Sequence, residues 1–363
     1  MRFRSTFFLA LLGVASLIAV GCGNDDDGGS APEQPAAESS ATEAPEPEAP
    51  EAEPAADVLV AFMSNQAAGD QGPVDGMIAG LEASSAANGH DIQVVEALDP
   101  AGFETQLRNL ADSGAEIIIT TFFDLGATVE LIAPDYPDVK FITVVSSPTE
   151  QPNVNALAYE FYKGAYIGGI YAAALTDTNR LGYVGGAPLP FAWADFNGFT
   201  EGAQSVNPEI QTTATFANGY EDPVGARELA SGLYADGVDF IFTGAAAGDL
   251  GVVEAAREDD GLVMVSSDLS DLAPANVALV VEIEWAVTIQ NEIEHILSGG
   301  ETGRFRLVGP DTGEISFAIP DAFLDQASGD RGDRARAVVA DIEAAVDSLL
   351  AGELVIEENT SEG

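Results

Sequence analysis

The sequence predicts an α/β protein of two similar lobes, each a parallel sheet flanked by helices. Segments with helical and with strand-like apolar spacing alternate along the chain after residue 57, which is the pattern of consecutive βαβ units. One helix–glycine–strand unit occurs twice, with Gly114 and Thr120 in the first copy and Gly237 and Thr243 in the second, 123 residues later. Further segments match in the same order at offsets of 122 or 123. A repeat of this length predicts two α/β lobes that face each other across a crevice.

The first 57 residues predict export, a lipid anchor and a tether. Residues 1–21 start with two arginines and continue as an apolar run that is short for a membrane span, which is typical of a signal peptide. Residues 19–22, Ala-Val-Gly-Cys, resemble the lipobox of bacterial lipoproteins, which implies cleavage before Cys22 and acylation of its sulfur. An ordinary secretory signal with a stray cysteine is the alternative. Residues 22–57 are rich in Pro, Ala and Glu and have little to bury, so we expect an extended tether. The domain beyond it would be held at a cell membrane, facing the periplasm or the cell exterior.

The net charge of −47 is extreme for 363 residues. Acidic side chains number 60 and basic ones 13, and only 11 of the acidic residues belong to the tether. Such a surface repels nucleic acid and anionic membranes, so neither is expected to bind directly to the folded part. Two explanations stay open. The charge solvates the protein in a salt-rich habitat, which predicts lower stability in low salt, or it is an acidic surface without a specific role.

The first lobe is expected to begin where an apolar strand follows the tether. Helical spacing comes next and should end at Gly89, because glycine is a common helix stop. The alternation then continues, which predicts a parallel sheet with helices on both faces. The expected strands are 58–62, 92–95, 116–121 and 139–145, and the expected helices are 75–88, 103–112 and 125–133.

The second lobe repeats this alternation and is followed by late strands that can carry the chain between the lobes. The expected strands are 154–160, 181–184, 211–216, 240–243 and 262–265, with helices 164–175, 195–205, 225–235 and 250–258, and with late strands 276–282 and 314–319. The first lobe would therefore comprise 58–153 with 283–313, and the second lobe 154–282. Residues 314–363 would hold the third crossing strand and a C-terminal helix.

Residues suited to catalysis are scarce. His90 and His295 are the only histidines, and both are expected at solvated positions. No Cys, His or Glu spacing suggests a metal site, and no cofactor fingerprint is present. The sequence therefore favours a protein that binds a ligand over an enzyme.

Four segments resemble the basic membrane protein family of ABC-transporter substrate-binding lipoproteins, which are relatives of the purine nucleoside receptor. The segments are residues 161–169, 181–184, 197–208 and 219–223, and the resemblance covers about residues 57–320. It implies a two-lobed type I periplasmic-binding fold that closes over a small ligand, commonly a purine nucleoside or base, and delivers it to an ABC permease. A monomer without enzymatic activity or cofactor is expected.

The resemblance also suggests part of the binding site. Asp70, Gln71 and Gly72 look like the first-loop Asp-x-Gly of the family, which carries over Asp70 as a ligand residue. Members of the family usually have an aromatic residue after that glycine, whereas this chain has Pro73. This difference puts stacking of a base on the first loop in doubt.

Other residues at the ends of strands can supply rings and polar groups. Phe122 and Phe123 follow strand 116–121, and Trp193 follows Pro190 in the matching loop of the second lobe; each ring could instead be buried under its own loop. Asp268 resembles the strand-end aspartate of the family and could accept hydrogen bonds from a ribose or a purine amino group, or could merely cap its loop. The remaining expected ligand residues are Gln71, Tyr159, Phe161, Pro190, Asn218, Tyr220 and Gly244.

Three alternatives stay open at this point. A binding protein for a sugar or another small metabolite would share the fold, and Pro73 favours it. A sensor subunit that passes its closed state to a signalling partner would use the same lobes. A nucleoside-processing enzyme is disfavoured by the scarcity of histidines.

Overall fold

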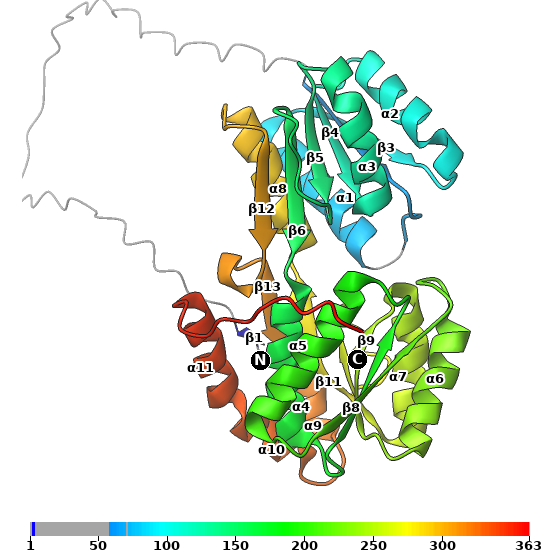
Figure 1. Cartoon of the computed structure of the whole chain (residues 1–363), viewed down its shortest axis with the longest axis vertical. Helices are drawn as coiled ribbons and strands as arrows, with labels where there is room; N and C mark the ends of the chain where they lie inside the picture. Colours follow the sequence, from blue (N-terminus) through cyan, green and yellow to red (C-terminus); the bar gives the residue numbers. More distant parts are fainter. Residues whose placement is uncertain (1, 4–57, 70–71, 363) are drawn as a thin grey trace, which may run out of the picture. The chain divides into compact units, whose positions relative to one another are not determined.

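The computed structural model of the chain describes residues 2–3, 58–69 and 72–362, and these residues form two sheets with helices on both faces (Figure 1). The predictions for Cys22 and residues 4–57 lie outside the described residues, as do Asp70 and Gln71. None of the helices in the described part is both long and apolar enough to cross a bilayer.

The first lobe contains six parallel strands in the order β12-β6-β5-β4-β2-β3. The strands are β2 (Leu59–Ser64), β3 (Asp91–Glu96), β4 (Ile117–Thr121), β5 (Lys140–Val144), β6 (Val154–Tyr159) and β12 (Arg304–Val308). Successive side chains of a strand point to opposite faces, so Val60 and Phe62 pack with helices α1 (Pro73–Asn88) and α8 (Trp285–Leu297). Ala61 and Met63 pack on the other face with α2 (Phe103–Asp112) and α3 (Phe122–Ile132).

The second lobe contains seven strands in the order β1-β13-β11-β10-β9-β7-β8, of which β1 and β13 run antiparallel to their neighbours. The strands are β1 (Arg2–Phe3), β7 (Arg180–Gly185), β8 (Gln211–Phe216), β9 (Phe240–Gly244), β10 (Leu262–Val265), β11 (Val277–Ile283) and β13 (Ile315–Ala318). The helices are α4 (Phe161–Leu175), α5 (Pro190–Val206), α6 (Pro223–Ala235), α7 (Asp249–Asp259), α9 (Asp321–Gln326), α10 (Arg331–Ala337) and α11 (Val339–Leu350).

Two cores cover the faces of this second sheet. Phe240 and Phe242 of β9 pack against α4 and α5, while Ile241 between them packs against α6 and α7. Helices α4 and α5 approach unusually closely, because a Cβ atom at Gly202 would lie 2.0 Å from the carbonyl oxygen of Tyr166. The C-terminal helices α9 to α11 complete the core on the α4 side.

The chain passes between the sheets three times, and one passage differs from the expectation. The sequence assigns residues 154–160 to the second lobe, whereas β6 pairs with β5 and β12 in the first sheet. The first crossing therefore follows Tyr159. The second crossing lies between β11 and α8, and the third between β12 and β13. Strand β12 was not expected, because arginines alternate with its apolar residues and its edge position leaves it half exposed.

His90 is also placed differently from the expectation. It is buried, and its Nε2 atom lies 3.0 Å from the Ser84 hydroxyl at the end of α1. His295 lies on α8, with Nε2 2.8 Å from the carbonyl oxygen of Glu301.

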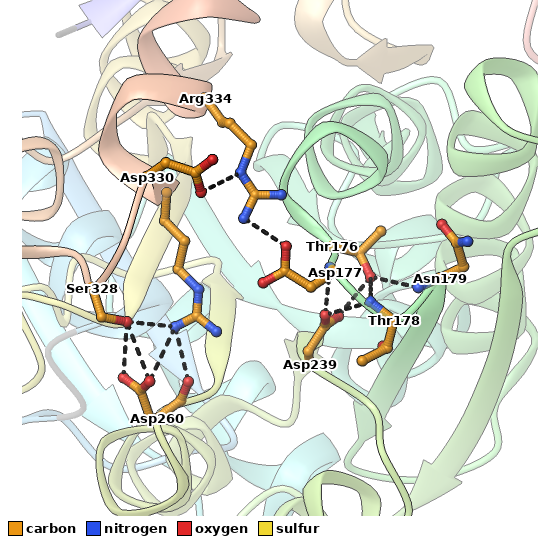
Figure 2. A network of polar contacts seen from close by, with 10 residues as sticks. Thr176, Asp177, Thr178, Asn179, Asp239, Asp260, Ser328, Asp330 and Arg334 are labelled. Carbon is orange, nitrogen blue, oxygen red and sulfur yellow. Dashed lines mark hydrogen bonds and ion pairs between the residues drawn. The ribbon is translucent and has the colours of Figure 1, made fainter.

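Polar groups tie the amino-end side of the second sheet to the C-terminal helices (Figure 2). The Asp239 carboxylate, just before β9, accepts hydrogen bonds from the Thr176 hydroxyl at 2.7 Å and from the amides of Asp177 and Thr178 at 2.6 and 2.9 Å. Arg334 of α10 forms an ion pair with Asp177 at 2.9 Å. The loop between α4 and β7 is thus held from two sides.

Replacing Asp239 by Ala is expected to lower the free energy of unfolding by about 1–3 kcal/mol, because three donors lose a charged acceptor. Urea unfolding measures the change. The exposed Asp236 at the end of α6 provides a control, and Asp236→Ala should change stability by less than about 0.5 kcal/mol. Equal effects of the two substitutions would contradict the assigned role of Asp239.

Candidate functional site

Backbone strain marks the carboxyl ends of strands in both sheets. Five described non-glycine residues have a positive φ angle. Three follow strand ends: Phe122 directly after β4, Val145 directly after β5 and Ala246 two residues after β9, with φ angles of 63°, 56° and 53°. The other two, Asn179 and Asp260, lie just before β7 and β10, with φ angles of 57° and 53°. Left-handed backbone is costly for side-chain-bearing residues, most of all for a β-branched valine, and it gathers at functional sites. Phe122 and Ala246 also follow the repeated Thr120 and Thr243, so the two lobes share this feature.

Three aromatic rings stack in a row at these strand ends, and we call them the aromatic ladder. Phe123 in the first turn of α3 stacks on Phe191 in the first turn of α5, with ring centroids 6.2 Å apart and planes inclined by 26°. Phe191 stacks on Tyr220, which follows β8, at 6.3 Å and 20°. Phe123 is 43% exposed although it is a large apolar residue. The ladder therefore joins the carboxyl ends of both sheets by ring faces.

Polar atoms without partners lie in the second lobe beside the ladder. The Tyr183 hydroxyl of β7, the indole N–H of Trp193 in α5 and the Tyr220 hydroxyl of the ladder are buried, and none has a hydrogen-bond partner in the part of the chain that the structure describes. The Tyr183 hydroxyl lies 2.9 Å from where a Cβ atom at Gly244 would be, so its side chain leans along the sheet toward the carboxyl end of β9. A side chain at Gly244 would displace this hydroxyl.

Two buried carboxyl groups adjoin the same edge of the second sheet. Burial raises the pKa of Asp195 in α5 well above its usual range. Asp249 begins α7 and accepts hydrogen bonds from the Thr243 hydroxyl at 2.6 Å and from the Ala245 amide at 2.8 Å. Burial outweighs these bonds and raises the pKa of Asp249 to about 6.

The raised pKa of Asp249 predicts a specific pH dependence of stability. Its folded form holds the proton more tightly than the unfolded chain does, so its contribution is present at pH 4 and is lost as the pH rises toward 6. The loss amounts to about 3 kcal/mol. Asp249→Asn keeps an acceptor oxygen for Thr243 and Ala245 but cannot ionise. The stability of this variant relative to the native chain should rise from pH 4 to pH 7, and a difference independent of pH would contradict the assignment.

Several expected ligand residues lie away from the ladder. Tyr159 and Phe161 stack on each other with centroids 5.2 Å apart at the first crossing, and Tyr159 also packs on Trp285 at 4.7 Å. Pro190 is the exposed first residue of α5, and Asn218 is exposed in the loop before Tyr220. Phe122 packs partly into the core of the first lobe.

Asp268 is exposed and bonds within its own loop. Its Oδ1 atom accepts hydrogen bonds from the Ser270 amide at 3.1 Å and the Ser270 hydroxyl at 2.6 Å, which is a local cap. Asp268 and Ser270 also line an open pocket of about 470 Å³ with residues of β11 and of the segment that follows β13. The structure thus places Phe123 and Tyr220 in the ladder, Trp193 in the helical turn that carries Phe191, Gly244 beside the Tyr183 hydroxyl, and Asp268 in a loop that it caps itself.

Phe191 is a member of the ladder that was not among the ligand residues expected from the sequence. It lies two positions before Trp193 in the same helical turn, and residues two apart in a helix point in nearly opposite directions. Trp193 packs edge-on against Phe216 and Phe196, with centroids at 4.9 and 5.9 Å. The sequence does show two aromatic residues, Phe191 and Trp193, close to the start of α5. Which of them points toward the ladder depends on the residue at which that helix begins.

The C-terminal segment holds α5 from outside. Residues beyond α11 run past α4 and α5 (Figure 1), and the side-chain amide of Asn197 donates to the carbonyl oxygens of Asn359 and Ser361 at 2.7 and 2.9 Å. Ile356 of this segment is buried. The helix whose first turn supplies Phe191 and Trp193 is therefore fixed by the end of the chain.

Two similar α/β lobes, joined by three crossings and with rings stacked at their strand ends, define the type I periplasmic-binding fold. Solved structures share this fold. A solute-binding protein of an ABC transporter system from Aeropyrum pernix matches with a TM-score of 0.72 at 16% identity, covering 84% of this chain and 94% of that chain. A corresponding protein from Conexibacter woesei matches with a TM-score of 0.66 at 24% identity, covering 83% and 99%.

Residues 58–340 match the family described as ABC transporter substrate-binding protein PnrA-like, and the chain belongs to this family. This membership confirms the expected basic membrane protein family and its class, which comprises extracytoplasmic transport proteins and not enzymes.

Relatives include a purine-binding protein of Brucella abortus, 29% identical over 201 residues, which cover 55% of this chain and 56% of that protein. Basic membrane protein A of Borreliella burgdorferi is 26% identical over 179 residues, covering 48% and 53%. A protein of Haloferax volcanii, named as a candidate ABC transporter glucose-binding protein, is 30% identical over 151 residues, covering 42% and 38%. The chain thus spans about half the length of the curated relatives it matches.

Proposed function

We propose that the protein binds a purine base or nucleoside at the aromatic ladder and delivers it to an ABC permease. The ladder carries this proposal, because it presents ring faces from both lobes at the strand ends where open α/β sheets bind ligands. The purine-binding relative supports the ligand class. Each stacked base contact contributes about 1–3 kcal/mol on comparable aromatic platforms.

The spacing of the ladder indicates how a ligand enters. A flat ring between two others needs about 7 Å between the outer planes, since stacked carbon atoms prefer about 3.5 Å. The centroids of Phe123 and Phe191 are 6.2 Å apart, and they belong to different lobes. The distance between two ring planes cannot exceed the distance between their centroids, so binding would separate these rings by at least roughly 1 Å. Because the rings otherwise cover each other, ligand affinity is coupled to movement of one lobe against the other.

Calorimetric titration tests the ligand class. The chain without its export signal, with Cys22→Ser to prevent acylation, is titrated with adenine, adenosine, guanosine and inosine, and with glucose and ribose as comparisons. Saturable heat with a purine and none with the sugars is expected. Saturable heat with a sugar and none with a purine would contradict this proposal and favour a sugar-binding protein.

The second candidate is a sugar-binding protein. Two observations favour it: Pro73 stands where the family usually has an aromatic residue, and the Haloferax volcanii relative carries a glucose-binding name. Aromatic faces also pack against the apolar faces of sugars, so the ladder is compatible with either ligand. The same titration separates the two candidates.

We further propose that Cys22 carries a lipid anchor, as its lipobox-like context suggests. The native chain should fractionate with membranes after expression in a bacterial host, and the Cys22→Ser chain should be released. Equal release of both chains would contradict acylation at Cys22.

A further inference from the structure

Tyr183, Trp193 and Tyr220 of the second lobe carry buried polar atoms without a partner among the described residues, and Tyr183 and Trp193 share one aromatic cluster. Tyr183 is fully buried, and among the described residues neither its hydroxyl nor the buried indole N–H of Trp193 has a hydrogen-bond partner. A buried polar group without a partner costs about 1–3 kcal/mol. Proteins retain such groups where a ligand or another partner completes the site.

The two side chains belong to one aromatic cluster. Tyr183 and Trp193 both pack against Phe196 and Phe216, with centroid distances between 4.9 and 6.1 Å. Tyr183 approaches this cluster from β7 and Trp193 from the first turn of α5, the turn that also carries Phe191 of the ladder. The position of the Tyr183 hydroxyl beside Gly244 places it toward the carboxyl end of the sheet. The Tyr183 hydroxyl therefore lies beside the carboxyl end of β9, and the Trp193 indole lies on the opposite side of the helical turn that carries Phe191.

Their chemistry restricts the group that they can bind. An indole N–H only donates, so it requires an acceptor, and a tyrosine hydroxyl can donate to the same acceptor. A carbonyl oxygen has two lone pairs and can accept from both. An exocyclic amino group would direct its hydrogens toward the indole N–H.

We propose that Trp193 and Tyr183 form a donor subsite that recognises the carbonyl oxygen of a 6-oxopurine in preference to the amino group of a 6-aminopurine. This inference rests on the proposed purine-binding function. Sites built to hydrogen-bond one ligand group reject analogues that leave buried polar groups unpaired.

The first test compares hypoxanthine and inosine with adenine and adenosine by calorimetry, using the chain without its export signal. The native chain should bind the 6-oxopurines at least about tenfold more tightly. Trp193→Phe and Tyr183→Phe remove one donor each and keep a ring, and each should weaken 6-oxopurine binding by about 5–30-fold while changing 6-aminopurine binding less than about twofold. A native chain without preference, or variants that weaken both ligand classes equally, would overturn the subsite while leaving purine binding intact. Absence of binding to any purine would overturn the proposed function together with the subsite.

The second test needs no ligand. Tyr171→Phe is a matched control, because Tyr171 is also fully buried in the second lobe but its hydroxyl donates to the Ala278 carbonyl oxygen at 2.8 Å. Tyr171→Phe should lower the melting temperature, whereas Tyr183→Phe should leave it unchanged or raise it. A drop for Tyr183→Phe as large as that for Tyr171→Phe would show that the Tyr183 hydroxyl is already satisfied in the unliganded protein, and the donor subsite would be wrong. The control should also leave the ratio of 6-oxopurine to 6-aminopurine affinity unchanged.

Discussion

Replacing Glu292 by Ala is expected to lower the free energy of unfolding by about 2–4 kcal/mol. Glu292 of α8 is 1% exposed and accepts hydrogen bonds from Arg304 at 2.7 Å and Arg306 at 3.0 Å, both on β12. Breaking a buried ion pair typically costs about 3–5 kcal/mol when the remaining charge has no partner. Arg304 would lose its acidic partner, whereas Arg306 would keep Glu314. The arginine side chains keep 31% and 22% of their exposure, so water compensates for part of the loss.

The effect is large because this network sits where the chain passes between the lobes. Arg306 also pairs with Glu314 through both terminal nitrogens, one of them at 2.9 Å, and these ion pairs hold the pKa of Glu314 below its usual value. The carbonyl oxygen of Glu314 in turn accepts from the amide of Glu284, so the second and third crossings are bonded to each other. Two of the 13 basic residues of the chain are thus committed to one crossing region.

Urea unfolding of the Glu292→Ala variant measures the change. Glu294→Ala on the exposed side of the same helix is the matched control and should cost less than about 0.5 kcal/mol. Similar losses for both variants would mean that general charge reduction, and not the network, sets the stability. A gain for both would point to repulsion among the many carboxylates as the dominant effect.

Replacing Phe191 by Ala is expected to weaken ligand binding by about 5–150-fold, equivalent to about 1–3 kcal/mol. Phe191 is the middle ring of the ladder and contacts both Phe123 and Tyr220, so its removal takes away stacking surface facing the first lobe. The ligand giving the largest heat in the titration is the probe. Phe191→Tyr keeps the ring and should retain affinity within about threefold.

Val224→Ala provides a control at the same edge of the second sheet. Val224 lies in the first turn of α6, is 68% exposed and takes no part in the ladder. Its substitution should leave affinity unchanged. Unchanged affinity of Phe191→Ala would place the ligand elsewhere, with the pocket beside Asp268 as the next site to examine.

The sequence predicted that aromatic residues lie at this site, but it did not predict in which direction each ring points. Phe123 lies in the ladder because it follows a buried strand, and the end of a parallel strand marks the binding edge of the sheet. Trp193 was the more conspicuous ring in the second lobe, yet Phe191 has the position that faces Phe123. The start of α5 at Pro190 sets which of the two points toward the first lobe, and periodicity alone locates a helix start only to within a few residues. Asp268 also follows a strand, but its carboxylate accepts a hydrogen bond from its own loop, so its position in the sequence did not predict its partner.

The apolar pattern of the sequence was sufficient to predict the two-lobed α/β architecture, its repeat and most of its helices and strands. Parallel strands are buried on both faces, so each appears in the sequence as a short apolar run between helical segments. The family could be inferred for the same reason, since its segments are contiguous in the chain. The allocation of β6 and β12 to the first sheet, the Glu292–Arg306–Glu314 network and the partnerless Tyr183 hydroxyl arise from contacts between residues far apart in sequence. Such contacts depend on the register and packing of whole sheets, and these become defined only when the lobes have folded.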